Sequence, residues 1–322
     1  MPGANVQYPL PLTRANSIYP GQFGVEGADD DDGFRVHPTG KVLYVDPNFP
    51  GAETTRDGTD PTNPLSTITA AVSKCRPYHG DVIMVGHNSS WQWAEGGRGI
   101  ATAQYTIPIA EEATLSVSGV RLVGQSFSGI GVPWNPVSDG GTCLTVTGND
   151  CIVEGFAFTE GATYTGCNGI SAIWDGATTF GENLTIRNCF FDDTVATAIS
   201  LNYCWFCDIH NNTFWVPTTG ISATASADYA LVHHNVFHEC TAAISAAASD
   251  HWHIFENDFY DSGAAGGAAG INCFVLSGDN HQVARNNMSC SLGAQYSVAN
   301  TPGVVNAWIN NYLLDGVTTG NP

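Results

Sequence analysis

A short phrase of apolar and polar positions recurs five times in the second half of the chain. In each copy, Asn or Cys follows an apolar anchor by three residues, and Phe or Met follows it by five. The copies span residues 186–191, 209–214, 232–237, 254–259 and 283–288. Their anchors are 23, 23, 22 and 29 residues apart. A repeat of this length indicates stacked structural units that bury their apolar faces against one another.

Each repeat contains short β-branched and aromatic runs that are separated by Asn, Gly and Ser. This pattern is typical of strands joined by tight bends, so we expect coils with three short strands each. Stacking should bring Asn212, Asn235 and Asn257 into an amide ladder at one bend, in the left-handed conformation that Asn tolerates. The same stacking should place one aromatic column inside the coils: Phe214, Phe237 and Phe259.

The repeated phrase resembles the right-handed parallel β-helix proteins of the pectate-lyase-like superfamily. The resemblance covers roughly residues 40 to 314 and implies an all-β fold, a right-handed parallel β-helix or solenoid. It does not imply one activity, because a single fold hosts many functions. Pectate lyases use clustered acidic calcium ligands and a basic proton acceptor, whereas the repeats here contain no Lys.

Three segments are expected along the chain. Residues 1–40 form an extended N-terminal arm, residues 41–314 form the β-helix, and residues 315–322 form a short tail. A capping helix is predicted at about residues 64–76, with Asn63 as N-cap and Pro64 at its first position. The resemblance implies that this amphipathic helix plugs the open end of the core. Extra residues in the early coils are expected to leave as loops around 128–142 and 159–181.

The arm combines prolines with apolar side chains that cannot all reach a core whose end is plugged. These are Tyr8, Leu10, Leu12, Ile18, Tyr19 and Phe23. We expect them to bury against a second chain, because exposed apolar patches mark interaction sites. The arm is therefore predicted to drive attachment or assembly.

Composition narrows the classes of function. Ten Lys and Arg stand against 30 Asp and Glu, a formal net charge of −20, which disfavours nucleic-acid binding. No run of eighteen apolar residues predicts membrane insertion, and the N-terminus has no secretory pattern. The ten Cys are expected to be buried small hydrophobes. The pair Cys204 and Cys207 has no second pair to complete a zinc site, so no metal and no cofactor is predicted.

Side chains along a strand point alternately into the core and outward, so the buried positions identify the outward ones. The position after each buried aromatic gives Asp192, Trp215, His238, Tyr260 and Ser289, and the position after each anchor gives Arg187, His210 and His233. Asp192, Trp215, His238 and Tyr260 are predicted to line a groove for a carbohydrate or a neighbouring subunit. The candidate catalytic residues are Asp192, Asp258, Asp261 and His238, since glycoside hydrolysis needs two carboxylates.

These catalytic sets are incomplete, and small residues at the corners favour packing between subunits. The sequence therefore favours a structural virion-surface protein, a capsid decoration or short spike, assembled as a homotrimer in the host cytoplasm. Its partners would be sister subunits and, through the arm, a capsid protein. The alternative is an extracellular, tailspike-like enzyme that degrades polysaccharide as a hydrolase or lyase, or a protein that binds a cell-surface glycan. Both resemble phage β-helix proteins.

Overall fold

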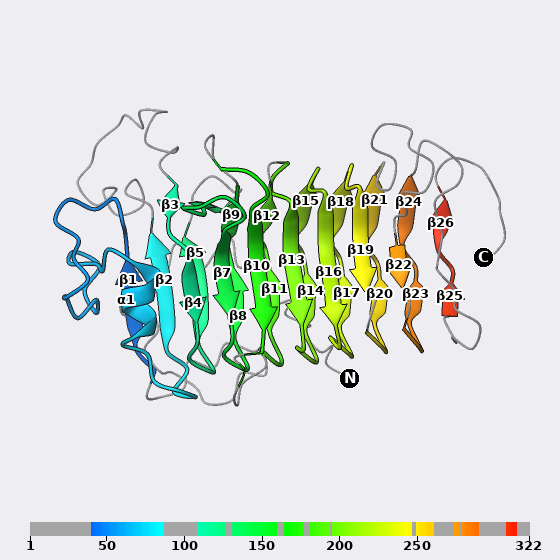
Figure 1. Cartoon of the computed structure of the whole chain (residues 1–322). Coiled ribbons are helices and arrows are strands. Elements are labelled where there is room, and N and C mark those ends of the chain that lie inside the picture. The colour runs from blue at the N-terminus through cyan, green and yellow to red at the C-terminus, as the bar shows by residue number, and fades with distance from the viewer. Residues whose placement is uncertain are drawn as a thin grey trace, which may run out of the picture.

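The chain coils into a right-handed parallel β-helix (Figure 1). The computed structural model describes residues 40–86, 108–125, 131–159, 164–174, 176, 181–193, 195–246, 249–260, 274–276, 278–289 and 307–313. In this part of the chain, three parallel sheets run along the solenoid, and each strand pairs with its equivalents in the coils before and after it. The predicted fold class is confirmed.

The sheets are named A, B and C. Sheet A contains, in spatial order, β1 (Val42–Val45), β2 (Val82–Gly86), β5 (Arg121–Gln125), β8 (Ile152–Glu154), β11 (Thr185–Arg187), β14 (Asp208–His210), β17 (Leu231–His233), β20 (His253–Phe255), β23 (Gln282–Ala284) and β25 (Ala307–Ile309). Sheet B contains β3 (Ile109–Ala110), β6 (Val132–Asn135), β9 (Phe156–Phe158), β12 (Phe190–Phe191), β15 (Thr213–Trp215), β18 (Val236–His238), β21 (Asp258–Tyr260), β24 (Asn287–Ser289) and β26 (Tyr312–Leu313). Sheet C contains β4 (Ala113–Leu115), β7 (Thr142–Val146), β10 (Asn168–Ile173), β13 (Thr197–Asn202), β16 (Thr219–Ala225), β19 (Ala242–Ala246) and β22 (Phe274–Leu276).

The core consists of side-chain columns that follow the strand register. The predicted aromatic column is buried, and the rings of Phe214 and Phe237 stack with centroids 4.4 Å apart. Phe237 and Phe259 continue the stack at 4.8 Å. Stacking at the coil spacing lets each ring bury both faces, so the column supplies a large part of the apolar contact between coils.

The predicted Asn ladder joins sheet A to sheet B. Nδ2 of Asn212 donates to Oδ1 of Asn235, and Nδ2 of Asn235 donates to Oδ1 of Asn257, both at 3.0 Å. The predicted left-handed conformation of these Asn residues is wrong. It belongs to the residue before each ladder position, including His234 and Glu256, with φ of 55° and 56°. The ladder Asn turns inward to satisfy buried backbone groups, and its neighbour makes the bend.

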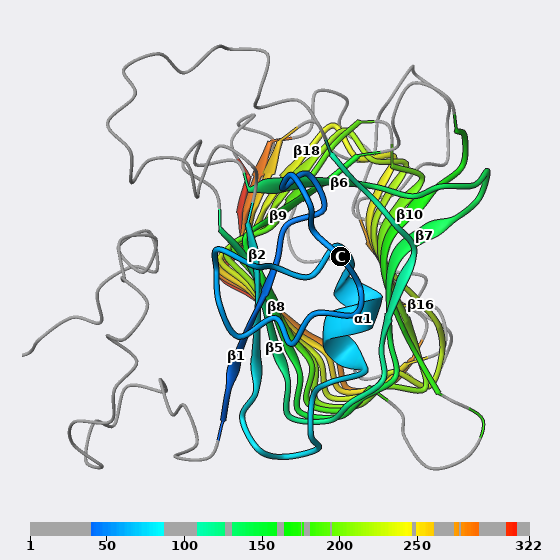
Figure 2. The same ribbon diagram turned by 90° about the vertical axis from the view of Figure 1, so that its left-hand side faces the viewer.

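The N-terminal end of the core is covered by α1 (Ile68–Val72), which lies across the mouth of the solenoid (Figure 2). This helix is shorter than the predicted 64–76, and Thr67 rather than Asn63 is its N-cap. Leu65 cannot join the helix because its backbone pairs with β1: its N–H donates to the carbonyl of Tyr44 at 2.8 Å. Ile68, Ala71 and Val72 nevertheless enter the core.

The two predicted loops need correction. The segment 128–142 contains β6 and the segment 159–181 contains β10, so the extra residues lie between the strands of a coil and neither segment is a loop throughout. The arm (Tyr8, Leu10, Leu12, Ile18, Tyr19 and Phe23), the catalytic candidate Asp261 and the tail lie outside the described residues. Among the helices of the described residues, none is long and apolar enough to cross a membrane.

Candidate functional site on sheet A

The outer face of sheet C offers little chemistry. Its central outward column places Ser171, Ser200, Ser222 and Ser245 in direct register. Hydroxyl groups without a neighbouring base are weak nucleophiles and weak acids. Titratable groups that could transfer protons stand on the other two faces, including His233 on sheet A and His238 on sheet B.

The outer face of sheet A carries a polar network. Two columns flank the buried anchors, and a third column stands at the left-handed bend that follows each strand. Asp208 comes from the first column, His233 from the second, and His234, Glu256 and Arg285 from the third. Because the coils repeat, groups from four successive coils come within bonding distance of their neighbours.

The network is a continuous chain of polar contacts. Nε2 of His233 lies 3.0 Å from Oδ1 of Asp208, and its Nδ1 lies 2.8 Å from Nδ1 of His234. Nε2 of His234 lies 3.0 Å from Oε2 of Glu256. Nε of Arg285 donates to Oε1 of Glu256 at 2.8 Å. Two imidazoles are thus held between two carboxylates.

These contacts restrict where protons can lie on the imidazole pair. Both carboxylates accept hydrogen bonds, so Nε2 of His233 and Nε2 of His234 each carry a proton. The contact between the two Nδ1 atoms is a hydrogen bond only when one of them also carries a proton. In that state the pair holds three protons, and one imidazolium is shared between the two rings. Such a pair can release a proton at one ring and accept one at the other.

Ring stacking orders the imidazoles. The ring of His233 lies between those of His210 and Phe255, each at a centroid distance of 4.9 Å. Burial lowers the pKa of His210, and nearby positive groups including Arg187 lower it further against the attraction of Asp208. His210 is therefore a neutral imidazole at pH 7, and the stack restrains the rotation of His233.

A second ionic cluster lies further toward the N-terminus on the same face. The buried carboxylate of Glu154 lies between Arg121 and Arg187, and Nε of Arg187 is 2.8 Å from Oε2 of Glu154. Two guanidinium groups surround one carboxylate, so this cluster is net positive. It adjoins His210 in the same outward column.

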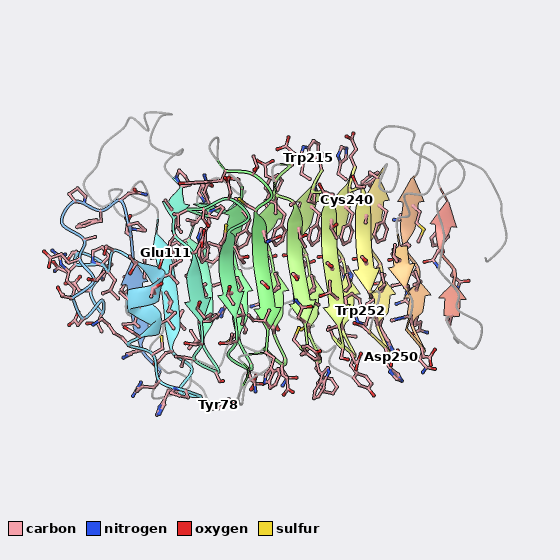
Figure 3. All side chains as sticks on the ribbon, viewed as in Figure 1. Tyr78, Glu111, Trp215, Cys240, Asp250 and Trp252 are labelled. Carbon is pink, nitrogen blue, oxygen red and sulfur yellow. The ribbon has the colours of Figure 1, made fainter. Side chains whose placement is uncertain are left out.

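The predicted groove residues do form a column on sheet B, where Trp215 pairs with His238 and His238 pairs with Tyr260. The rings of Trp215 and His238 stack at 4.0 Å with an interplanar angle of 1°. Trp215 and Tyr260 are 44% and 40% exposed. Figure 3 shows Trp215 at the opposite edge of the solenoid from Asp250. The column therefore presents an aromatic surface to solvent.

The two candidate carboxylates along sheet B are too far apart to work as a pair. Asp192 and Asp258 stand three coils from each other, about 14 Å along the axis. Glycoside hydrolases hold their two carboxyl groups within roughly 5–9.5 Å. Burial raises the pKa of Asp192, while Oδ1 of Asp258 accepts a hydrogen bond from Asn287.

Sequence reasoning found one column of the sheet A network and missed the rest. Arg187, His210 and His233 share the position after the anchor. The second position after the anchor is also shared by three charged or titratable residues, and this pattern in the sequence could have identified them. They are His234, Glu256 and Arg285. This position is the left-handed bend, which directs side chains back over the sheet.

Metal chemistry has no support from the side-chain geometry. Across the described ranges, no three or more His, Cys, Asp or Glu side chains are grouped so that they could hold a metal ion. The described cysteines are free thiols, and all except the half-buried Cys75 are buried. The prediction that Cys serves as a buried small hydrophobe is confirmed for these buried residues.

Comparisons with known proteins support the fold. Residues 137–280 match a family model described as a periplasmic copper-binding protein (NosD). No curated protein matches the sequence. The chain is similar to an alginate lyase from Paenibacillus sp. str. FPU-7, with 13% identity, a TM-score of 0.56 and coverage of 85% of this chain and 96% of that one. This likeness shows a shared parallel β-helix fold.

Two further structures have weaker likeness. A complex of XylC with xylose has 13% identity and a TM-score of 0.43, over 77% of this chain and 66% of that one. A PL6 family alginate lyase, AlyGC, has 14% identity and a TM-score of 0.44, over 76% of this chain and 36% of that one.

Proposed function

We propose that this chain is a polysaccharide lyase that cleaves a uronate-containing glycan on the outer face of sheet A. The observation that carries the proposal is the chain of contacts from Asp208 through His233, His234 and Glu256 to Arg285. It places a proton-sharing imidazole pair beside a guanidinium on an accessible surface.

Elimination from a uronate needs a base, an acid and a cation. The base removes the proton on C5, and the electron pair of that C–H bond forms the C4–C5 double bond. The C4–O4 bond breaks, and the acid donates a proton to O4. A positive group beside the C5 carboxylate stabilises the negative charge that develops. No water is consumed, and the enzyme ends with the proton count with which it began.

The network supplies these three roles. When the substrate enters and the contact between the two Nδ1 atoms opens, the Nδ1 that carries no proton takes the proton from C5, and the protonated Nδ1 of the other ring supplies the proton to O4. The side chain of Arg285 is 53% exposed, and its terminal nitrogens bind the uronate carboxylate while Nε holds Glu256. Asp208 and Glu256 keep each imidazole in the required orientation.

Hydrolysis is less well supported at this face. Asp208 and Glu256 are separated by two coils, about 9.6 Å along the axis before any sideways offset is added. That separation exceeds the range for paired carboxylates in glycoside hydrolysis. The intervening imidazoles fill the place where water would attack. Elimination uses those imidazoles directly.

The comparisons bear on the wider function. The alginate lyase shares only the fold with this chain, and it favours the polysaccharide-degrading alternative over a virion-surface role. The matched family model describes periplasmic proteins, which supports a site of action outside the cytoplasm. Copper is not part of the proposal, because the described residues offer no group of ligands for a metal.

The test is to incubate the purified chain with alginate, polygalacturonate and a glucuronate-containing polysaccharide. Elimination leaves an unsaturated sugar at the new end, which absorbs ultraviolet light and is lighter than the hydrolysis product by one water. His234→Ala and Arg285→Ala should each lower the rate by about 100-fold or more.

The matched control is His253→Ala, an exposed imidazole on the same face that lies outside the network. It should retain the wild-type rate. The proposal is overturned if folded protein makes no unsaturated product from any of these substrates. It is also overturned if His234→Ala and His253→Ala behave alike.

A further inference from the structure

The corner between sheets C and A holds a column of left-handed residues. From Tyr78 to His251, each corner N–H donates to a carbonyl of the next coil, which keeps the corners in register. The column includes Tyr78, Gly119, Asp150, Asn183, Phe206, Tyr229, His251 and Asn280. Figure 3 shows Tyr78 and Asp250 along this edge of the solenoid.

Three successive corners carry rings where small residues fit better. Phe206, Tyr229 and His251 have φ of 59°, 60° and 60°, a conformation that Gly, Asn and Asp adopt at lower cost. Phe206 and Tyr229 are also 54% and 46% exposed. Backbone strain and exposure both oppose aromatic residues here. Folding alone therefore does not explain them, and strained positions of this kind point to function.

The rings form one stack, which we call the corner ridge. Tyr229 lies 5.1 Å from Phe206 and 4.7 Å from His251, so its two faces are covered. The other face of Phe206 has no ring partner among the described residues. It is directed to the preceding corner, where Nδ2 of Asn183 donates to Oδ1 of Asp150 at 3.0 Å. An aromatic face thus adjoins an amide and a carboxylate.

Carboxylates run beside the ridge. Oδ1 of Asp228 accepts the N–H of Asp250 at 2.7 Å, and Oδ1 of Asp250 accepts the N–H of Asp279 at 2.6 Å. Each of these two carboxylates keeps a second oxygen for other donors. Rings that alternate with hydrogen-bond acceptors match a sugar, whose C–H groups form an apolar face and whose hydroxyls donate from its rim.

The charge of the ridge excludes other occupants. A second copy would place the same row of carboxylates against itself, whereas the core of a protein interface is depleted of charge. Nucleic acids, acidic peptides and anionic lipid surfaces would be repelled by the Asp row. A polyuronate would be repelled in the same way. A basic chain would be attracted by the Asp row, but the carboxylate beside the open face of Phe206, that of Asp150, is already bonded to Asn183, so an uncharged glycan fits that face better.

We propose that the corner ridge binds a neutral glycan, with one sugar packed on the open face of Phe206. Asn183 and Asp150 bind hydroxyls of that sugar, and Asp228 and Asp250 bind hydroxyls further along. This site goes beyond the activity proposed for sheet A. The glycan-binding proposal does not depend on activity at sheet A, because the corner ridge lies on a different edge of the solenoid and binds a different class of sugar.

The test uses Phe206→Asn and Tyr229→Asn. Asn accepts the left-handed backbone, so both variants remove a ring without adding strain. Affinity electrophoresis in gels that contain a neutral β-glucan, a mannan or a xylan should retard the wild type. We expect a loss of retardation with Phe206→Asn and a fall of at least severalfold with Tyr229→Asn. Tyr78→Asn is the matched control, an exposed ring in the same backbone conformation four corners away, and should bind as the wild type does.

Three results would overturn the proposal. The first is that the wild type is not retarded by any neutral glycan, on gels or on an array. The second is that a wild-type oligomer seen by sedimentation dissociates in Phe206→Asn, which would assign the ridge to a second copy. The third is equal binding with a much lower melting temperature in both variants, which would assign the stack to stability. Absence of polyuronate cleavage would neither support nor overturn glycan binding at the corner ridge.

Discussion

Asp208 and His233 meet across adjacent coils, with Oδ1 of the carboxylate 3.0 Å from Nε2 of the imidazole. Burial alone would raise the pKa of Asp208. The hydrogen bond from His233 and the positive groups nearby outweigh burial, and the pKa lies below its ordinary value. Asp208 is thus ionised across the neutral range, so it accepts a hydrogen bond from Nε2 of His233 and fixes the orientation of that ring.

Asp208→Asn should remove the charged acceptor of that hydrogen bond. The ring of His233 would then be held less firmly, and the rate of elimination should fall. The rate at which unsaturated product forms measures the effect, with His253→Ala as the control. A wild-type rate in Asp208→Asn would show that the contact has no role in elimination.

Trp215→Ala tests the column on sheet B as a carbohydrate contact. The indole is stacked on His238 by one face and is 44% exposed, so its removal should change the free energy of unfolding little. Retention on polysaccharide gels should fall while the melting temperature stays nearly constant. Tyr312→Ala removes another exposed ring from sheet B and is the control. Blank glycan arrays, together with burial of Trp215 between subunits, would rule out this contact.

The fold was predictable because the same repeat determines the length of each coil, the position of a bend and the residues of the core. The period of the apolar anchors sets the coil, and the Asn at the third position sets one bend. One residue type then satisfies several backbone groups, as Asn235 does toward Ile209 and Asn212. Errors arose where local propensity and tertiary pairing disagree. Asn63 and Pro64 are good helix-start residues, yet Leu65 pairs with β1 and moves the start of the helix to Thr67.

The sheet A network was only partly predictable for a related reason. Alternation assigns outward positions within a strand, and it assigned His210 and His233 correctly. It says nothing of the bend residue that follows. There the left-handed backbone of His234 and Glu256 places their side chains beside the neighbouring coils. The sequence pattern did not predict the corner ridge, because aromatic residues are not expected in the left-handed backbone conformation.

Phe237→Ala should cost about 3–5 kcal/mol of unfolding free energy. The ring is fully buried between Phe214 and Phe259, so its removal leaves a cavity that neighbouring coils cannot fill without breaking strand register. Val236→Ala, a half-buried outward neighbour, should cost much less. Urea unfolding of the two variants gives the comparison. Equal costs would show that the aromatic column does not dominate core packing.

Asn235→Ala should be more damaging than its size suggests. Its side chain accepts the N–H of Asn212 at 3.0 Å and donates to the carbonyl of Ile209 at 2.8 Å. Each buried group left without a partner costs about 1–3 kcal/mol, so the loss should reach several kcal/mol. Asn211→Gly, at the exposed left-handed position beside Asn212, is the control, because Gly accepts that backbone conformation. Hydrogen exchange of the Asn212 amide should accelerate in Asn235→Ala alone.

Asp46 supplies a stability prediction with a defined pH window. Burial raises its pKa to about 7, although the backbone N–H groups of Asn48 and Phe49 act in the opposite direction. Oδ2 is buried without a hydrogen-bond partner among the described residues. The ordinary pKa of the unfolded chain is 3.8. Below that value both states are protonated, and the group contributes no pH dependence.

As the pH rises from about 4 to about 7, the unfolded chain releases this proton while the folded protein retains it, so the free energy of unfolding falls. Above about 7 both states are ionised and the loss is complete, on the order of a few kcal/mol at 1.36 kcal/mol per unit. Asp46→Asn removes the titration but keeps an acceptor for the two N–H groups. Its stability relative to the wild type should therefore rise between pH 4 and pH 7 and then level off. Urea unfolding at several pH values measures this difference, and a difference that does not vary with pH would show that Asp46 is ionised in the folded protein throughout.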